Sequence, residues 1–260
     1  MRLLLTNDDS IESPFLHALI HALRAAGHDL IIAAPKTEQS WIGCAKSRHR
    51  PVTSAAADRG FGCPTFVIDG TPSDCVSIAL AHLISSDKPI DAVVSGINVG
   101  RNASLGFILA SGTIAGAWEG AVHGIPAIAF SLDLTPEHFA ALHAAGLKPD
   151  PALQQTLAIA SARAALLVPS LVAATPPRSF IVHNVNFPAG CTADTPLHRT
   201  VPARVIVPGL FSPAADDGTH RFIFKFGDDV SPAEPLTDRD AIERGLISHT
   251  ILDYTKLGGI

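Results

Sequence analysis

Residues 2–35 have the sequence RLLLTNDDSIESPFLHALIHALRAAGHDLIIAAP, and this stretch sets the architecture expected for the whole chain. Arg2–Thr6 and Asp29–Ala34 are short apolar runs bounded by turn formers or proline, which is typical of buried strands. Between them, Ser13 and Pro14 supply an N-cap and a first helical residue. Apolar residues follow at helical spacing: Leu16, Leu19, Ile20 and Leu23. The order strand, helix, strand predicts a βαβ unit with parallel strands.

The same alternation continues to about residue 190. Further strands are predicted at Thr65–Ile68, Ile90–Val94, Ile125–Phe130 and Phe180–Val185. Helices are predicted to begin at Thr71-Pro72 and to cover Thr113–His123 and Leu153–Leu167. Strands that alternate with helices over such a length predict an α/β fold with a doubly wound, mostly parallel sheet.

The last quarter has a different pattern. Arg204–Val207 and Arg221–Phe226 are predicted strands, and the second places phenylalanine at every other position. Turn-forming residues separate them, which predicts a lobe rich in β-hairpins. Thr237–Gly245 is typical of a capped helix, and Leu246–Leu252 is predicted to be a final strand.

Composition limits the class of protein. The chain has 260 residues, of which 47% are hydrophobic and 17% charged, so it can bury a full core and is not disordered. Its formal net charge of −5 argues against a partner that is a nucleic-acid polymer or a membrane surface, since both need a basic footprint. We expect a single domain, with a core over residues 1–190 and a β-rich lobe over residues 191–260.

No segment is expected to cross a membrane or to direct export. The apolar stretch Ala158–Ala174 is interrupted by Arg163 and Pro169, and the N-terminal run Leu3–Leu5 is too short for a signal peptide. The four cysteines lack the spacing of a zinc site and are expected to be reduced thiols. A cytoplasmic location is therefore predicted.

Polar residues that follow the predicted strands form a candidate metal site. Ligands bind beyond the carboxyl ends of the strands in an open parallel sheet. Asp8 and Asp9 follow the first strand. Two adjacent carboxylates repel each other, and a divalent cation between or beside them would compensate their charge. Ser40 and Asn98, from loops at the same edge, can complete an oxygen cage for Mg²⁺ or Mn²⁺. In the alternative interpretation, Asp8 and Asp9 only turn the chain and cap the next helix.

A second group predicts a seat for phosphate. Ser111, Gly112 and Thr113 precede a predicted helix, whose first backbone N–H groups and dipole favour an anion. Asn7 and Asn102, from the neighbouring loops, are added as candidate substrate-binding residues. An oxygen cage opposite an anion seat favours hydrolysis of phosphate esters.

Motifs spread over residues 1 to about 252 together resemble the SurE family of 5′/3′-nucleotidases. Each motif is weak alone, but they occur in the order and at the spacing of that family. They are LTNDD (5–9), AP (34–35) with QS (39–40), DGTPSDC (69–75), SGINVG (95–100), SGT (111–113) with EG (119–120), GIPAIA (124–129), NVNFP (184–188), and TD (237–238) with GLIS (245–248).

The resemblance implies a Rossmann-like fold and a phosphomonoesterase that depends on one divalent metal ion per subunit. Its substrates would be nucleoside 5′- and 3′-monophosphates, with polyphosphate hydrolysis as an accompanying activity. The resemblance implies that Asp8 and Asp9 are catalytic and hold the metal with Ser40 and Asn98. It also implies a homodimer or homotetramer in which the C-terminal elements contact a second subunit.

The chain departs from the family pattern near the site. Ser10 and Trp41 stand where the family commonly has glycine, and Ala110 replaces a usual tyrosine. If position 10 requires a positive φ, serine is strained there. These departures bear on the choice of substrate. They also keep open a non-catalytic module that senses nucleotide or metal, and a phosphatase that acts on other phosphate esters.

In the expected mechanism, positioning and electrostatics stabilise the charge that develops on phosphorus. Asp8 or Asp9 acts as a general base, or Asp8 attacks phosphorus directly. The residues alone leave both routes open.

Overall fold

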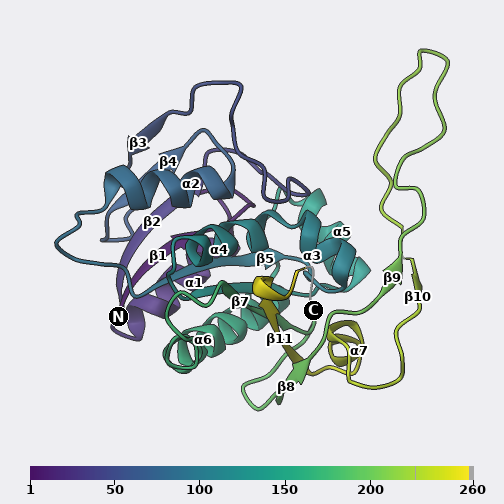
Figure 1. The fold of residues 1–260 in the computed structure, drawn as a ribbon. Coiled ribbons are helices and arrows are strands. Elements are labelled where there is room, and N and C mark those ends of the chain that lie inside the picture. The colour runs from purple at the N-terminus through teal and green to yellow at the C-terminus, as the bar shows by residue number, and fades with distance from the viewer. Residues whose placement is uncertain (226, 258–260) are drawn as a thin grey trace.

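The structure is a computed structural model that describes residues 1–225 and 227–257. It has three layers, with a mixed sheet between two groups of helices (Figure 1). The helices and strands, in chain order, are β1 (Arg2–Thr6), α1 (Pro14–Ala25), β2 (Asp29–Pro35), β3 (Ser54–Ala56), β4 (Thr65–Ile68), α2 (Pro72–Ile78), the π-helix η1 (Ala79–Leu83), β5 (Ala92–Val99), α3 (Leu105–Ala110), α4 (Gly112–Val122), β6 (Ala127–Leu132), α5 (Pro136–Ala144), α6 (Pro151–Ala173), β7 (Ile181–Phe187), β8 (Leu197–Thr200), β9 (Val205–Ile206), β10 (Asp228–Asp229), α7 (Asp238–Glu243), β11 (Ile247–Asp253) and the 3₁₀ helix η2 (Tyr254–Lys256).

The main sheet has nine strands in the order β3-β4-β2-β1-β5-β6-β7-β11-β8. The strands from β4 to β7 run parallel to one another, as predicted for consecutive βαβ units. The direction in which successive strands are added reverses at β1. β2 and β4 are added on one side of β1, and β5, β6 and β7 are added on its other side. Such a reversal opens a crevice at the carboxyl ends of the strands, which is where ligands bind in folds of this kind.

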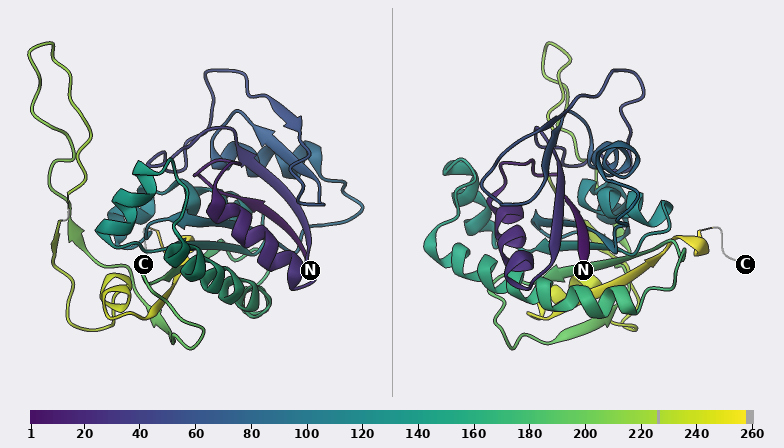
Figure 2. Two further views of the ribbon diagram at one scale, coloured as in Figure 1. Left: turned by 180° about the vertical axis from the view of Figure 1, so that it is seen from behind. Right: turned by 90° about the vertical axis from the view of Figure 1, so that its left-hand side faces the viewer.

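The core lies on both faces of the sheet. Leu3 and Leu5 of β1 pack with the apolar face of α1, whereas Leu4 packs with the helix α2 on the opposite face. This division follows from the alternation of side chains along a strand. Figure 2 shows α1 and α6 on one face and α2 and α4 on the other. The predicted doubly wound α/β architecture is confirmed.

β5 is longer than predicted. The sequence indicates a strand that ends at Val94, but β5 continues to Val99, with a shift in its register against β6 between Ser95 and Asn98. Gly96 allows this course, because a Cβ there would lie 2.2 Å from the carbonyl oxygen of Phe130. Asn98 therefore lies near the end of β5 and not in the loop after it.

The C-terminal quarter differs from the prediction in two segments. The final strand β11 lies in the main sheet, antiparallel to β7 and parallel to β8. The predicted strand Arg221–Phe226 is absent over its described residues 221–225, where only an isolated bridge joins Phe222 to Phe211. Phe226 lies outside the described residues. Residues 207–225 instead form a long arm that projects from the body of the molecule (Figures 1 and 2).

Helix α6 is also longer than predicted and runs through Pro169. Among the described residues it is the one helix that is long and apolar enough to cross a membrane. Its buried positions, which include Leu157, Ala164 and Val168, belong to the core cluster that contains α1. An apolar stripe that packs against the core in this way is typical of a core helix, so we interpret α6 as a core helix.

Two buried histidines join β7 to β11 and predict a loss of stability in acid. His183 Nδ1 lies 2.9 Å from His249 Nε2, and His183 Nε2 lies 2.8 Å from the Thr175 hydroxyl. Burial lowers the pKa of each imidazole from 6.5 to about 4. Between pH 6.5 and pH 4 the two imidazoles therefore bind protons in the unfolded chain but not in the folded one. Proton binding favours the unfolded chain, so the free energy of unfolding decreases as the pH falls from about 6.5 to about 4.

The expected result is a Tm that falls between pH 7 and pH 4.5 by about 5 °C more in the wild type than in His249→Gln. Circular dichroism of both proteins across this range measures the difference. Equal falls would contradict the assignment to this pair.

Candidate active site

The predicted site residues lie where β1, β2 and β5 end, at the carboxyl edge of the parallel strands. Asp8 follows β1, and its carboxylate accepts two hydrogen bonds from Thr113 at the start of α4: from the hydroxyl at 2.5 Å and from the backbone N–H at 3.0 Å. Asp8 is 3% exposed. Its negative charge thus lies at the positive end of a helix, which favours the ionised carboxylate.

Asp9 is held from the other side of the site. Its Oδ2 accepts a hydrogen bond of 3.0 Å from the backbone N–H of Val99, the last residue of β5. Asp9 is 8% exposed. The two adjacent carboxylates are therefore fixed by separate elements, one by α4 and the other by β5.

Burial disfavours the charge on both acids. Burial raises the pKa of Asp8 from 3.8 to about 6, and the hydrogen bonds from Thr113 oppose part of that rise. Burial and then the negative charge of Asp8 raise the pKa of Asp9 well above its ordinary value. A divalent cation beside the pair would reverse both effects, since an opposite charge favours the ionised carboxylate.

A close approach between α4 and Asp8 requires glycine at position 112. A Cβ on Gly112 would lie 2.7 Å from the Asp8 Cβ and 2.9 Å from the carbonyl oxygen of Gln39. The Gln39 backbone N–H in turn donates to the Asp8 carbonyl at 2.7 Å. The loop after β2 thus packs directly against Asp8 and the first residue of α4.

The other two predicted metal ligands lie next to these contacts. Ser40 follows Gln39 and is exposed, with its backbone N–H bonded to the Glu38 carboxylate at 2.7 Å. Asn98 precedes Val99, and its Nδ2 donates to the Gly100 carbonyl at 2.6 Å, which leaves its Oδ1 as the atom suited to a cation. The segments that carry all four predicted ligands are therefore brought together.

The predicted phosphate seat is partly taken by the protein itself. The Thr113 N–H donates to Asp8, and the Ile114 N–H donates to the Ser111 hydroxyl, which caps α4. Ser111 and Thr113 thus position the helix and Asp8. The sequence prediction did not include the bond from Thr113 to Asp8, because it links segments that are 105 residues apart in the chain.

The two predicted asparagines have different surroundings. Asn7 donates from Nδ2 to the Ser10 carbonyl at 2.8 Å, while its buried Oδ1 has no hydrogen-bond partner. Asn102 donates to the Ser131 hydroxyl, and its carbonyl accepts bonds from Asn184 and Asn186. Asn102 therefore braces the loop after β5, and its contact with substrate stays a prediction.

The two positions that depart from the family's glycine have glycine-like backbones. Ser10 has a φ of 78° and Trp41 a φ of 61°. Each costs about 1–3 kcal/mol, and such strain persists only where the surroundings fix the backbone. Ser10 directly follows Asp9 in the chain, and Trp41 directly follows Ser40.

Sequence reasoning missed a partly buried ion pair that anchors the loop after β2. The Lys46 ammonium lies 2.6 Å from the carboxylate of Glu119, whose side chain is 5% exposed. Glu119 belongs to α4, the helix that also holds Asp8. No local pattern in the sequence around Lys46 indicates a partner on α4.

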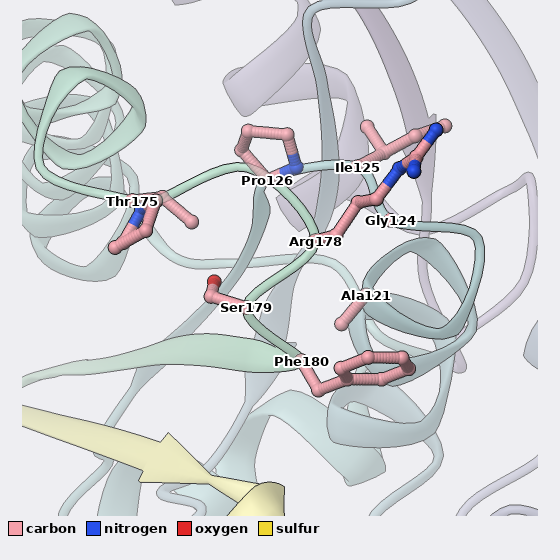
Figure 3. Close-up of a pocket in the computed structure, with 9 residues that line it drawn as sticks. Ala121, Gly124, Ile125, Pro126, Thr175, Arg178, Ser179 and Phe180 are labelled. Atoms are coloured by element: carbon pink, nitrogen blue, oxygen red, sulfur yellow. The ribbon is translucent and has the colours of Figure 1, made fainter.

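A cleft of about 260 Å³ opens beside Asp9. It is lined by Ser10, Glu12, Ser13 and Pro14 before and within α1, and by residues 146–148 between α5 and α6. A second hollow lies near the amino ends of β6 and β7, between Gly124 and Phe180 (Figure 3). That hollow is too tight for a ligand and lies at the edge of the sheet away from the acidic pair.

Within residues 1–225 and 227–257, no three His, Cys, Asp or Glu side chains gather into a metal-binding group. The candidate centre therefore relies on two carboxylates together with neutral amide and hydroxyl oxygens. Such a donor set suits a hard cation that keeps some of its water.

The fold and this site define an α/β protein with a paired-carboxylate centre at the carboxyl edge of its parallel strands. A family model described as Survival protein SurE matches residues 3–205. The chain therefore belongs to the SurE family, as the sequence motifs indicated.

Relatives and a solved structure agree with this assignment. The chain is 31% identical to "5′-nucleotidase SurE" of Methanocella arvoryzae over 94% of this chain and 88% of that protein. It is 36% identical to the protein of the same name from Solidesulfovibrio magneticus, over 98% and 92% of the two chains. The crystal structure of the SurE protein from Aquifex aeolicus superposes on this chain with a TM-score of 0.74 and 25% sequence identity. The alignment includes 99% of this chain and 97% of the Aquifex aeolicus chain.

Proposed function

We propose that this chain hydrolyses nucleoside 5′-monophosphates to a nucleoside and phosphate, with the help of a divalent cation. The observation that carries the proposal is the burial of two adjacent carboxylates, Asp8 and Asp9, which α4 and β5 hold in place at the carboxyl edge of the parallel strands. Relatives that align over most of the chain are named 5′-nucleotidases. Hydrolysis of 3′-monophosphates and of short polyphosphate belongs to the same proposal.

The residues present fit one Mg²⁺ or Mn²⁺ per subunit. Asp8 and Asp9 would hold it, with Ser40 and the Asn98 Oδ1 as neutral ligands. The buried Asn7 Oδ1, which has no hydrogen-bond partner, is a further oxygen in this loop that suits a cation or its water. A bound cation of this kind polarises a phosphoryl group and lowers the pKa of water.

The chain's own groups supply positioning. Thr113 fixes the Asp8 carboxylate with two hydrogen bonds, so Asp8 is oriented before substrate arrives. The start of α4 stabilises negative charge at this place, whether on Asp8 or on a phosphate beside it. Asp8 or Asp9 acts as the general base, or Asp8 attacks phosphorus directly.

We also propose a cytoplasmic homodimer or homotetramer that assembles through residues 191–260. The arm supports this, because it projects from the body and leaves Phe211 62% exposed, and Ile206 at the end of β9 is equally exposed. Exposed apolar side chains on a projecting segment are typical of a surface that another subunit covers.

A panel of phosphate esters tests the activity. Phosphate release is measured from 5′-AMP, 5′-GMP, 3′-AMP, ribose 5-phosphate and a short polyphosphate, with Mn²⁺ or Mg²⁺ and with EDTA. We expect release from the 5′-monophosphates that EDTA abolishes. Calorimetry that finds Mn²⁺-dependent binding of AMP without release of phosphate would instead indicate a sensor on this fold.

A further inference from the structure

Four aromatic side chains from separate segments meet next to the candidate active site. Trp41 lies in the loop after β2, Phe107 in α3, and Phe222 and Phe224 in the arm. The Trp41 ring centroid is 5.4 Å from that of Phe107, 5.0 Å from that of Phe222 and 6.2 Å from that of Phe224. We call these four residues the aromatic cluster.

The aromatic cluster faces solvent over much of its surface. Trp41 is 42% exposed, Phe222 46% and Phe224 49%. Large aromatic rings are normally buried, so an exposed group of them indicates a surface that binds something apolar. Contacts with Phe107 and Phe222 hold the Trp41 ring in the group.

Backbone contacts place the aromatic cluster beside the acidic pair. Trp41 is two residues beyond Gln39, whose N–H donates to the Asp8 carbonyl, so the Cα atoms of Gln39 and Trp41 lie at most about 7 Å apart. Gly43 then donates to the Ala110 carbonyl at 2.9 Å, which fixes the other end of this short segment against α3. Phe107 lies in α3, four residues before Ser111.

We propose that the aromatic cluster stacks the base of a purine nucleotide whose phosphate lies at Asp8 and Asp9. This rests on the proposed function, which places a phosphate ester at that pair. Bases present a flat π-face, and stacking on aromatic rings is the common way in which proteins bind them without reading their edges. Purines offer the larger face, so they bind better than pyrimidines.

The cleft beside Asp9 is the competing place for the nucleoside. Its lining combines the polar residues Ser10, Glu12, Ser13 and Lys148 with Pro14 and Leu147, and it contains no aromatic ring. The cleft therefore offers no flat π-face on which a base could stack. The aromatic cluster is therefore the better match to the apolar part of the substrate.

The first test compares a substrate that has a base with one that lacks it. In the presence of Mn²⁺, Trp41→Ala and Phe222→Ala are expected to lower kcat/KM for AMP about 10-fold, through KM, and to leave ribose 5-phosphate unchanged. Phe139→Ala is the matched control, because Phe139 is 46% exposed like Phe222 but lies on α5. A loss of the same size for both substrates would overturn the proposal.

The second test does not depend on hydrolysis. In a Trp118→Phe background, Trp41 is the remaining tryptophan, and its fluorescence is expected to change saturably with adenosine. Adding Phe222→Ala should weaken that binding about 10-fold. If AMP is not hydrolysed but adenosine binds in this way, the proposed function fails and the base site stands.

Two results would overturn the base site alone. The first is that Lys148→Ala, and not Phe222→Ala, weakens binding of adenosine, which would place the nucleoside in the cleft. The second is that Trp41→Ala changes the molar mass measured by light scattering and leaves the AMP to ribose 5-phosphate ratio of kcat/KM unaltered. The aromatic cluster would then be an interface between copies of the chain.

Discussion

Asp9→Asn is expected to lower Mn²⁺-dependent phosphate release from AMP by at least about 10³-fold while the protein stays folded. The amide keeps an oxygen that accepts the hydrogen bond from the Val99 N–H. It removes one of the two negative charges that would hold the cation. Stopped assays of phosphate with a range of Mn²⁺ concentrations measure the loss.

Asp69→Asn is the matched control. Asp69 also follows a strand of the main sheet, but its carboxylate is 48% exposed and pairs with Arg50 at 3.4 Å. Its neutralisation should leave activity within a factor of about two, as surface ion pairs contribute little. Full activity of Asp9→Asn would show that the acidic pair is not the catalytic centre.

Thermal unfolding gives a second measurement on the same variant. Burial raises the pKa of Asp9, so the ionised group destabilises the metal-free fold at neutral pH and the neutral amide should raise its Tm. With Mn²⁺ at about 100 times its Kd, the wild type should gain about 2.7 kcal/mol, or about 5–10 °C, and Asp9→Asn should not. A variant that has merely unfolded would instead lose Tm without metal.

The sequence indicated the sheet well because its order depends on local patterns. Arg2–Thr6 and Thr65–Ile68 were predicted with the bounds that the structure has. Their apolar runs end at turn formers, and the intervening helices show clear spacing. A strand's own residues do not specify its neighbours, however. β11 was therefore predicted as a strand but not as the partner of β7 and β8.

The sequence predicted which segments form the candidate site, but it did not predict the hydrogen bonds that hold the site together. Asp8 and Asp9 follow β1, and the rule that ligands bind at the carboxyl ends of strands was enough to select them. The hydrogen bonds of Thr113 to Asp8 span 105 residues and depend on how α4 packs on the sheet. The sequence did not predict the arm, because alternating phenylalanines are typical of a strand paired within a sheet. In the structure, Phe222 and Phe224 pack against Trp41 instead.

Gly112→Ala provides the sharpest test of that packing. The added Cβ would lie 2.7 Å from the Asp8 Cβ, 2.9 Å from its Oδ2 and 2.9 Å from the Gln39 carbonyl oxygen. The Gln39 contact is with backbone, so the start of α4 must move relative to Asp8. A displacement of this kind should lower kcat/KM for AMP about 100-fold and cost about 1–3 kcal/mol of stability.

Gly106→Ala is the matched control, because it adds the same methyl group to a helix without a steric clash. Gly106 lies in α3, and a Cβ there would meet only the Val207 Cγ2 at the ordinary distance of 3.6 Å. Since alanine is favoured over glycine in a helix by up to about 1 kcal/mol, this variant should keep its activity and its Tm. If Gly112→Ala retains activity within about threefold of Gly106→Ala, the contact between Asp8 and α4 does not position the catalytic carboxylate. A selective loss in Gly112→Ala would mean that the hydrogen bonds of Thr113 to Asp8, and not the carboxylate alone, make the centre competent.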